Sequence, residues 1–465
     1  RKYYMIVITT LAEYQTCFWL KVALKLEETG HEVVLLSFDD RSSELLNNSG
    51  LTSYNVPLLA RAVSNVRFKN NQEALKFYGI EDINYWISHE RVTWKLKNGQ
   101  DLVSRLISYT QAIEEVFSTL KIDGKEITLV QELGGFIAVI ASFFAARQQN
   151  IDNIFLEPAF FKGRLFPLKN SFSAPTIKSS DGRLATKEVK ELLELAIRSQ
   201  SIVIPQKDAH QYRDAFAKIL SGKNIKRVIE KTVDKYVLGK HQEFGHLGRY
   251  ITLHLGMALN AIRMRSSYTP LDSLTDFIYF PFHVPGDMAL TLRSPEYFDQ
   301  LALVEYMLKI VPYTHIVAVK EHPAQIGGID ALRLKALLKQ FDNLVVINPG
   351  INNYKVLNKA QLIVSINSKS GAEAGMLGKP SIVLGDAFYK DSPLVSAVAG
   401  LRSLKTSIRV ALDETKPLSD EQRDSYFQDV WDETYPGELY IQDDHCVNTF
   451  SQSITRIVKG LALNP

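Results

Sequence analysis

The first 40 residues alternate between short apolar runs and one amphipathic stretch. Residues Tyr4–Thr10 form an apolar, β-branched run that is typical of a buried strand, and a second such run follows at Val33–Phe38. Between them, apolar side chains recur with helical spacing from Phe18 to Leu26, and Gly30 ends the pattern. A strand, a helix and a second strand in so short a segment predict a βαβ unit and therefore a parallel sheet.

The same alternation recurs along the chain. A strand, a helix and a strand are predicted at Ile127–Gln131, Phe136–Arg147 and Ile154–Glu157, with a polar, helix-rich insertion at about 60–120. A second series follows, with strands at Phe277–His283, His315–Lys320, Leu344–Ile347, Leu362–Ile366 and Ser381–Leu384, and helices at Pro295–Ile310, Ile329–Phe341 and Gly371–Leu377.

These patterns predict an α/β protein of two consecutive domains that face each other across a cleft. We expect a first domain at 1–265, in which 187–265 is a basic helical region, and a polar, proline-containing connection at 265–275. The second domain is expected at 277–400. A helical segment at 401–465 is expected to pack back across the cleft.

The composition excludes several classes of protein. With 46% hydrophobic and 23% charged residues, the 465-residue chain is neither disordered nor a disulfide scaffold. Its net charge of +3 is too even to indicate nucleic-acid binding. The two cysteines, Cys17 and Cys446, indicate a reducing compartment, and the longest apolar run, Phe136–Ala146, is about half the ~20 residues that a transmembrane helix needs. We therefore expect a cytoplasmic protein.

Positive charge is concentrated in one part of the chain. Twelve Lys or Arg stand against five Asp or Glu between Lys207 and Arg265. Such a stretch is either a solvated helical face or a surface that meets anionic lipid or a phosphate-bearing acceptor, and the second interpretation predicts peripheral contact with the inner face of a membrane.

The most informative motif is a serine-rich turn between a strand and a helix. The strand ends at Asn367, and Ser368, Lys369, Ser370 and Gly371 lead directly into the helix. Backbone N–H groups and the positive end of the helix dipole make such a turn a phosphate site, although serine is also a common helix cap. Glu373, about one turn into the helix, is placed to accept hydrogen bonds from a ribose. We interpret the turn as a nucleotide-phosphate site.

Charged residues also follow two neighbouring strands of the second domain. Lys320 and His322 come at the end of one strand, where Pro323 stops further pairing, and His283 and Asp287 follow another. Parallel sheets bind ligands at the carboxyl ends of their strands. His283 and Asp287 are either turn residues, with Asp287 starting the next helix, or an acid/base pair that faces the cleft.

The first domain offers two carboxylates at strand ends, Glu132 before Gly134-Gly135 and Glu157 before Pro158. Sugar chemistry commonly uses a pair of carboxyl groups, as acid and base or as a covalent nucleophile. The loop after Glu157 contains Lys162 and Arg164 beside aromatic residues, a combination suited to the carboxylate of an anionic sugar.

Several signatures are missing from the sequence. The first strand is not followed by G-x-G-x-x-G, and the chain has no Walker A loop, no His-x-x-x-His helix, no Cys-x-x-Cys and no D-x-D motif. We therefore expect catalysis that uses no metal and no cofactor, with a nucleotide sugar as the donor substrate.

Together, four motifs resemble the bacterial capsule-polysaccharide synthesis proteins, a family that includes retaining β-Kdo transferases. They are Val319-Lys320-Glu321-His322-Pro323, the segment from Ser365 to Glu373, Leu377-Gly378-Lys379-Pro380, and Gly385-Asp386-Ala387-Phe388-Tyr389. Their order and spacing match the family's K-x-H-P, serine-rich turn, G-K-P and G-x-x-F-Y. The resemblance is specific over about 277–390 and loose over the first 200 residues.

This resemblance implies a GT-B fold of two Rossmann-like domains and a CMP-activated ulosonic acid as donor. Lys320 and His322 would meet the phosphate opposite Ser368 and Ser370, and Glu373 would take the ribose. The resemblance further implies retention through a carboxylate nucleophile. We favour Glu157 and Glu132 as the functional pair and keep Asp287 as a weaker candidate, while Asp208 and Asp234 remain open.

The predicted function is transfer of Kdo or a similar sugar acid from a CMP donor to a capsule or lipopolysaccharide glycan. The alternatives are a UDP-sugar transferase or epimerase of the same fold, and a non-catalytic glycan-binding component of a capsule assembly or export complex. The expected partners are a nucleotide sugar and a glycan or glycolipid acceptor.

Overall fold

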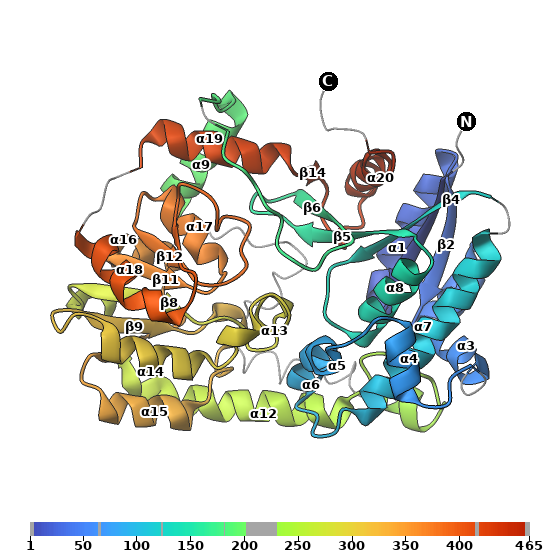
Figure 1. Ribbon diagram of the computed structural model, residues 1–465, viewed down its shortest axis with the longest axis horizontal. Helices are drawn as coiled ribbons and strands as arrows, with labels where there is room; N and C mark the ends of the chain where they lie inside the picture. The colour runs from blue at the N-terminus through green and yellow to red at the C-terminus, as the bar shows by residue number, and fades with distance from the viewer. Residues whose placement is uncertain are drawn as a thin grey trace.

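The computed structural model describes residues 4–63, 67–121, 124–180, 182–200, 230–413 and 418–460. Its described residues form two seven-stranded sheets, each at the centre of one domain (Figure 1). Five parallel strands of each sheet follow the Rossmann-like order 3-2-1-4-5, in which the central strand is the first of its series. The predicted fold class, an α/β protein of GT-B type, is confirmed.

The first sheet has the order β14-β6-β5-β4-β1-β2-β3. Its strands are β1 (Tyr4–Thr10), β2 (Glu32–Ser37), β3 (Thr52–Asn55), β4 (Glu126–Glu132), β5 (Asp152–Pro158), β6 (Arg164–Lys169) and β14 (Tyr435–Pro436). The pairs from β3 to β5 are parallel, whereas β6 and β14 add an antiparallel edge.

Side chains of β1 alternate between two helical layers, because successive residues of a strand point to opposite faces. Ile6 and Ile8 pack towards α1 (Glu13–Glu28). Met5 and Val7 pack towards α7 (Gln100–Leu120) and α8 (Ile137–Gln148). The remaining helices of this domain are α2 (Asp40–Asn47), α3 (Val56–Val63), α4 (Asn71–Phe77), α5 (Ile83–Trp86) and α6 (Ser88–Trp94).

The second sheet has the order β13-β12-β11-β8-β9-β10-β7 and is entirely parallel. Its strands are β7 (Tyr268–Thr269), β8 (Phe277–Pro281), β9 (Ile316–Lys320), β10 (Leu344–Ile347), β11 (Leu362–Ser365), β12 (Ser381–Val383) and β13 (Ser396–Ala397). The helices are α13 (Met288–Thr291), α14 (Gln300–Ile310), α15 (Ala331–Gln340), α16 (Asn353–Lys359), α17 (Lys369–Met376) and the 3₁₀ turns η3 (Arg265–Ser267), η4 (Leu271–Ser273), η5 (Pro295–Tyr297) and η6 (Pro323–Gln325).

One sequence prediction fails at the start of this domain. We interpreted 265–275 as a connection, but Tyr268 and Thr269 pair with Val346 and Ile347 as the edge strand β7. A two-residue strand is too short to carry a periodic pattern, so only its neighbour in the sheet reveals it.

The segment at 187–265 reaches both domains. Helix α9 (Lys187–Ser199) lies beside α19 (Asp420–Asp432), and the carbonyl of Gln200 accepts a hydrogen bond from Asn352 at 2.9 Å. The long helix α12 (Leu247–Met264) contacts both α15 and α6 (Figure 1). Residues 201–229, which contain much of the predicted basic region and Asp208, lie outside the described residues.

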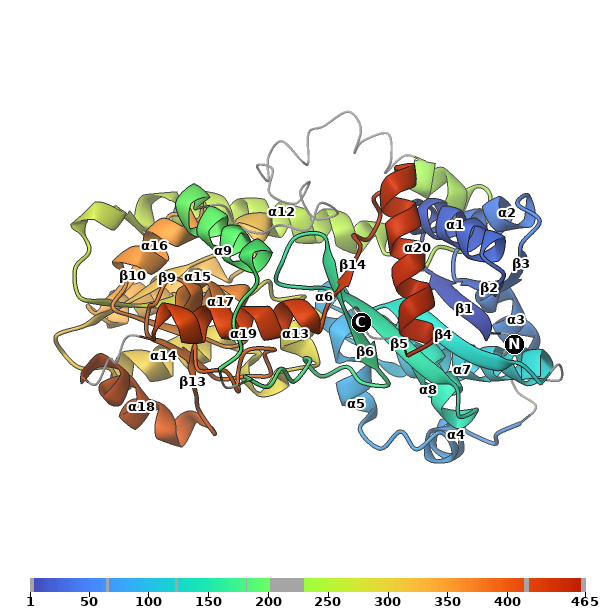
Figure 2. The same cartoon turned by 90° about the horizontal axis from the view of Figure 1, so that it is seen from above.

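The C-terminal segment also contacts both domains. Helix α18 (Leu401–Asp413) packs on the second sheet through Leu404 and Ile408. The chain then passes through α19 and β14, and α20 (Asp444–Val458) packs against α1 of the first domain (Figure 2). Among the described residues, no helix combines the length and the hydropathy required to cross a bilayer.

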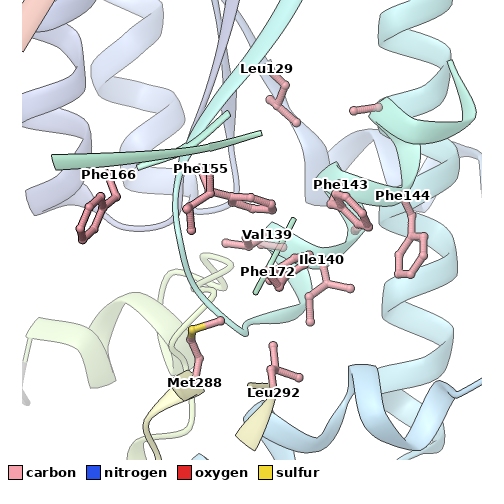
Figure 3. Packing of buried hydrophobic residues seen from close by; sticks show 14 of the residues in the cluster. Leu129, Val139, Ile140, Phe143, Phe144, Phe155, Phe166, Phe172, Met288 and Leu292 are labelled. Atoms are coloured by element: carbon pink, nitrogen blue, oxygen red, sulfur yellow. The ribbon is translucent and has the colours of Figure 1, made fainter. Parts of the chain in front are cut away.

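One apolar cluster continues from the first domain into the second. Met288 and Leu292, at the two ends of α13, pack with Phe155 and Phe172 of the first domain (Figure 3). The same short helix is bonded to the α5–α6 region, where the hydroxyl of Tyr85 donates to the carbonyl of Leu292 at 2.6 Å. Helix α13 therefore fixes the loop after β8 against the first domain.

Candidate functional site

The candidate nucleotide residues lie at or just after the carboxyl ends of three adjacent strands of the second sheet. His283 follows β8, and the turn from Asn367 to Ser370 follows β11. Lys320 is the last residue of β9, and His322 lies on the loop after it. Strands β8 and β11 are the pair at which the strand order reverses, and open α/β sheets bind their ligands at this position, beyond the carboxyl ends of the strands.

The serine-rich turn is held in place by hydrogen bonds within the turn and with Ser365 and Tyr389. Ser368 caps α17, since its Oγ accepts from the Ser370 N–H at 3.2 Å, and its own N–H donates to Ser365 Oγ at 3.0 Å. The hydroxyl of Tyr389 donates to the Ser368 carbonyl. The turn is thus a preorganised helix N-terminus, which is the geometry that favours an anion.

We expect Gly371→Ala to destabilise this turn. A Cβ at Gly371 would lie 2.4 Å from the Tyr389 Oη and 2.7 Å from its Cζ, so either the ring or the turn must move. Overpacking of this kind costs about 1–3 kcal/mol, and we expect a matching loss in urea unfolding together with weaker nucleotide binding. Gly256→Ala in α12 is the control, because nothing lies within 4 Å and alanine favours a helix. Wild-type stability of Gly371→Ala would contradict the tight packing of Tyr389 on the turn.

Asn367 and His283 connect the loops after β11 and β8. The Asn367 Nδ2 donates to the Ala289 carbonyl at 2.6 Å and to Ser294 Oγ at 3.0 Å, while its buried Oδ1 has no partner among the described residues. The backbone N–H of Asn367 makes a long 3.4 Å hydrogen bond to His283 Nε2. Burial lowers the pKa of His283 to about 4. A neutral, acceptor imidazole favours a positioning role for His283 over the acid or base role expected from the sequence.

Lys320 and Glu373 lie buried beneath the turn. Burial lowers the pKa of Lys320 to about 8, against the opposing charge of Glu373. Burial also raises the pKa of Glu373, whose Oε2 accepts from Asn353 Nδ2 at 2.9 Å. Asn353 donates to Ser370 Oγ at 3.0 Å as well. This geometry favours a supporting role for Glu373 under the turn, in place of the predicted direct contact with a ribose.

His322 lies in the loop after β9, directly before η6. Its Nδ1 accepts from the Ala324 N–H at 3.3 Å, and Pro323 begins η6 as the sequence suggests. Burial, with the charge of Lys320, lowers the pKa of His322 to about 4. Glu321 turns away and binds the N–H groups of Gly327 and Ile329 at 3.1 and 3.0 Å. An arriving phosphate would reverse the electrostatic balance at His322 and favour its protonation.

Asp287 is the predicted carboxylate that lies nearest to these histidines. Its Oδ1 caps α13 through the Ala289 N–H at 2.9 Å. Burial lowers the pKa values of His283 and His322, and the charge of Asp287 opposes that effect at both. The cap that the sequence suggested is therefore present, and the charge of the same carboxylate acts on both histidines.

The two carboxylates of the first domain have protein partners. Glu132, at the end of β4, accepts hydrogen bonds from the Tyr440 hydroxyl and from Gln15 Nε2. Glu157, at the end of β5, forms a bidentate ion pair with Arg293 of the second domain, with both N–O distances 2.8 Å. Lys369 also bridges the domains, since its Nζ donates to the Ala159 carbonyl at 3.1 Å. The carboxyl edges of the two sheets therefore face each other.

Two further candidate residues have internal partners. The guanidinium of Arg164 bonds to the Thr434 hydroxyl at 2.9 Å and to the carbonyls of Trp431 and Thr434 at 3.0 and 2.6 Å, so it anchors the C-terminal segment on β6. Asp234 is buried in an ion pair with Arg41 at 2.6 Å, which makes it structural. Lys162 lines a small pocket with Glu438 and Leu439 at the same edge of the sheet.

Sequence reasoning missed Asn353, Ser294 and Arg293. Asn353 stands in an Asn-Asn pair before a short helix, which is a cap signal without a hint of its tertiary contacts. Arg293 and Ser294 follow a four-residue helix and carry no motif. No cluster of three or more metal-ligating side chains was found in the described residues.

The match to a known protein family covers these loops. Residues 193–406 match the model of the family described as capsule polysaccharide biosynthesis protein. Over this region the chain is therefore similar to the capsule polysaccharide biosynthesis family. The predicted resemblance is thereby confirmed, and every nucleotide-loop residue from His283 to Glu373 lies inside the matched region.

A curated relative is much longer than the segment that it shares with this chain. Protein FixF of Sinorhizobium fredii (strain NBRC 101917 / NGR234) is 32% identical over 140 residues, which are 29% of this chain and 33% of FixF. The chain therefore spans about a third of that relative.

Solved structures with a similar arrangement include two Thermosulfurimonas dismutans KpsC transferases. The beta Kdo 2,4 transferase is 13% identical over 65% of this chain and 79% of its own, with a TM-score of 0.32. The beta Kdo 2,7 transferase is 13% identical over 74% and 90%, with a TM-score of 0.34. Anabaena Alr3699/HepE in complex with UDP-glucose is 11% identical over 98% and 100%, with a TM-score of 0.32. At these values the similarities say nothing about donor or acceptor.

Proposed function

We propose that this protein is a glycosyltransferase that moves Kdo, or a similar ulosonic acid, from a CMP donor to a growing surface glycan. One observation carries the proposal. A buried lysine and a histidine at the end of β9, and a capped serine-rich helix N-terminus after β11, flank the end of β8 at the strand reversal in the second sheet. That combination suits the single phosphate of a nucleoside monophosphate as a leaving group.

In the proposed reaction, the phosphate lies on the Ser368–Ser370 turn, with Lys320 beneath the turn and His322 on the neighbouring β9 loop. An Asp287 oxygen attacks the anomeric carbon, the bond from that carbon to the phosphate oxygen breaks, and CMP leaves as an anion. The acceptor oxygen then attacks the same carbon and displaces Asp287. Glu132 or Glu157 takes the proton from the acceptor hydroxyl. Two displacements at one carbon give the retention implied by the family resemblance.

Nucleotide selectivity tests the donor. A ligand at a hundredfold excess over its Kd stabilises a native protein by about 2.7 kcal/mol. We expect CMP to raise the melting temperature more than UDP or GDP, and we expect His322→Ala to lose this effect. His315→Ala is the control, because His315 is paired with Thr314 and Gln361 at an exposed position. Stabilisation by UDP alone would contradict a CMP donor and favour a UDP-sugar enzyme.

Catalysis is tested with CMP-Kdo. We expect CMP release in the presence of a surface-glycan acceptor and, without acceptor, a protein adduct with the mass of one sugar. If neither turnover nor adduct appears with any CMP-sugar while CMP still binds, a non-catalytic glycan-binding role is favoured.

A further inference from the structure

A buried ion pair crosses the interface between the two domains. The Nη1 and Nη2 atoms of Arg293 each lie 2.8 Å from an oxygen of Glu157, and its Nε donates to the Phe172 carbonyl at 2.8 Å. The Arg293 side chain is 6% exposed, whereas that of Glu157 is 25% exposed. This bidentate fork is the arrangement by which arginine recognises a carboxylate.

Arg293 lies directly beside the nucleotide loops. The next residue, Ser294, accepts hydrogen bonds at its Oγ from Asn367 Nδ2 and from the Asp386 N–H, both at 3.0 Å. The charges of Asp386 and, more weakly, Asp287 also act on Arg293. The guanidinium is therefore placed between the phosphate turn, the proposed nucleophile and the first domain. The Nε and Nη2 atoms of Arg164, which the sequence suggested for a sugar carboxylate, are instead bonded to Trp431 and Thr434 of the C-terminal segment.

We propose that Arg293 is the binding site for the carboxylate of the donor sugar, and that Glu157 holds this site until the donor arrives. This inference rests on the proposed function. A buried guanidinium needs an anion at all times, because an unpaired buried charge strongly destabilises the fold. Exchange of the Glu157 carboxylate for a substrate carboxylate preserves that pairing, and Glu157 is the more exposed partner.

The exchange links substrate recognition to base activation. A donor without a carboxylate cannot replace Glu157, so it meets an arginine that is already paired. The carboxylate of an ulosonic acid binds the Arg293 guanidinium in place of Glu157. Glu157 is then an unpaired carboxylate at the interface between the domains. Released in this way, Glu157 can accept the proton of the acceptor hydroxyl, which a carboxylate held by arginine does poorly.

Two variants with opposite expected effects test this inference by isothermal titration with CMP-Kdo and with CMP. Glu157→Gln removes the competing carboxylate, so CMP-Kdo should bind about tenfold more tightly while CMP binds as before and turnover falls. Arg293→Gln should weaken CMP-Kdo binding about 10- to 100-fold and leave CMP binding unchanged, as expected for a lost charged hydrogen-bonded pair. Arg293→Lys should be intermediate, because it keeps the charge and loses the fork.

The controls separate this inference from the proposed function. Arg333→Gln removes an exposed ion pair with Asp299 in the same domain and should change nothing. If Glu157→Gln unfolds, the double variant Glu157→Gln/Arg293→Gln removes both charges and should bind CMP-Kdo as weakly as Arg293→Gln. Unchanged CMP-Kdo affinity in Arg293→Gln, or no gain in a folded Glu157→Gln, would overturn the inference. Failure of the wild type to bind or turn over CMP-Kdo would instead count against the proposed function.

Discussion

Asp287→Asn should retain nucleotide binding and lose turnover by at least about 10⁴-fold, because it removes the proposed covalent nucleophile on which both displacements depend. The Asp287 oxygen that caps α13 accepts from the Ala289 N–H at 2.9 Å, and an asparagine caps a helix equally well. The substitution therefore removes a charge and a nucleophile without removing the local structure. Initial rates with CMP-Kdo and CMP binding by calorimetry measure the two quantities separately.

The control for this prediction is another capping aspartate. Asp330 caps α15 by accepting from the N–H groups of Leu332 and Arg333, so Asp330→Asn repeats the chemical change away from the proposed site. It should leave the rate unchanged. Intact-mass analysis with CMP-Kdo alone adds a second readout, since the sugar adduct should appear in the wild type and be absent from Asp287→Asn. Retained turnover in Asp287→Asn would direct the search for a nucleophile to Glu132 or Glu157.

Strands β1, β2, β4 and β5 of the first sheet and β8 to β12 of the second were predictable, because each is a short apolar run with its own local signal. Strands β3, β6, β7, β13 and β14 were not predicted. The runs at Tyr4–Thr10 and Leu362–Ile366 agree with β1 and with β11, which ends one residue earlier. The serine-rich turn was also predictable, since a strand, a cap and a helix start follow one another directly in the sequence. Such features depend on neighbours within a few residues, and a single sequence contains that information.

Tertiary partners were not predictable, and they changed the assignment of several site residues. The sequence places a carboxylate at Glu373. It does not reveal that Asn353 donates a hydrogen bond to this carboxylate beneath the serine-rich turn. It places a cation at Arg164 but does not reveal the carbonyls at 431–434 that engage it. Whether a charged side chain faces a ligand or an internal partner is decided by chain segments hundreds of residues away, which no local pattern encodes.

Lys320→Met should weaken CMP binding at least about 100-fold at pH 7, since a buried cation that pairs with a phosphate is worth several kcal/mol. It should not destabilise the unliganded protein. Burial lowers the pKa of Lys320 from 10.5 to about 8, so its ammonium is a cost to the native state. Because each pKa unit is about 1.4 kcal/mol, that cost is about 3 kcal/mol at pH 7. Lys320→Met also loses the favourable charge interaction of Lys320 with Glu373, so its gain in native-state stability is smaller than this cost.

The pKa of Lys320 also predicts how native-state stability and CMP affinity change with pH. The pKa of Lys320 is lower in the native than in the unfolded chain, so between about pH 8 and 10.5 the unfolded chain binds more protons. The contribution of Lys320 to stability therefore rises with pH in this window, whereas CMP affinity should fall as pH rises through about 8 and the ammonium is lost. Lys320→Met should show neither change. Calorimetry with CMP and urea unfolding at pH 7 and pH 9.5 measure both, with Lys309→Met on the exposed face of α14 as control. Equal CMP affinity of the wild type at the two pH values would exclude Lys320 as the phosphate-binding cation.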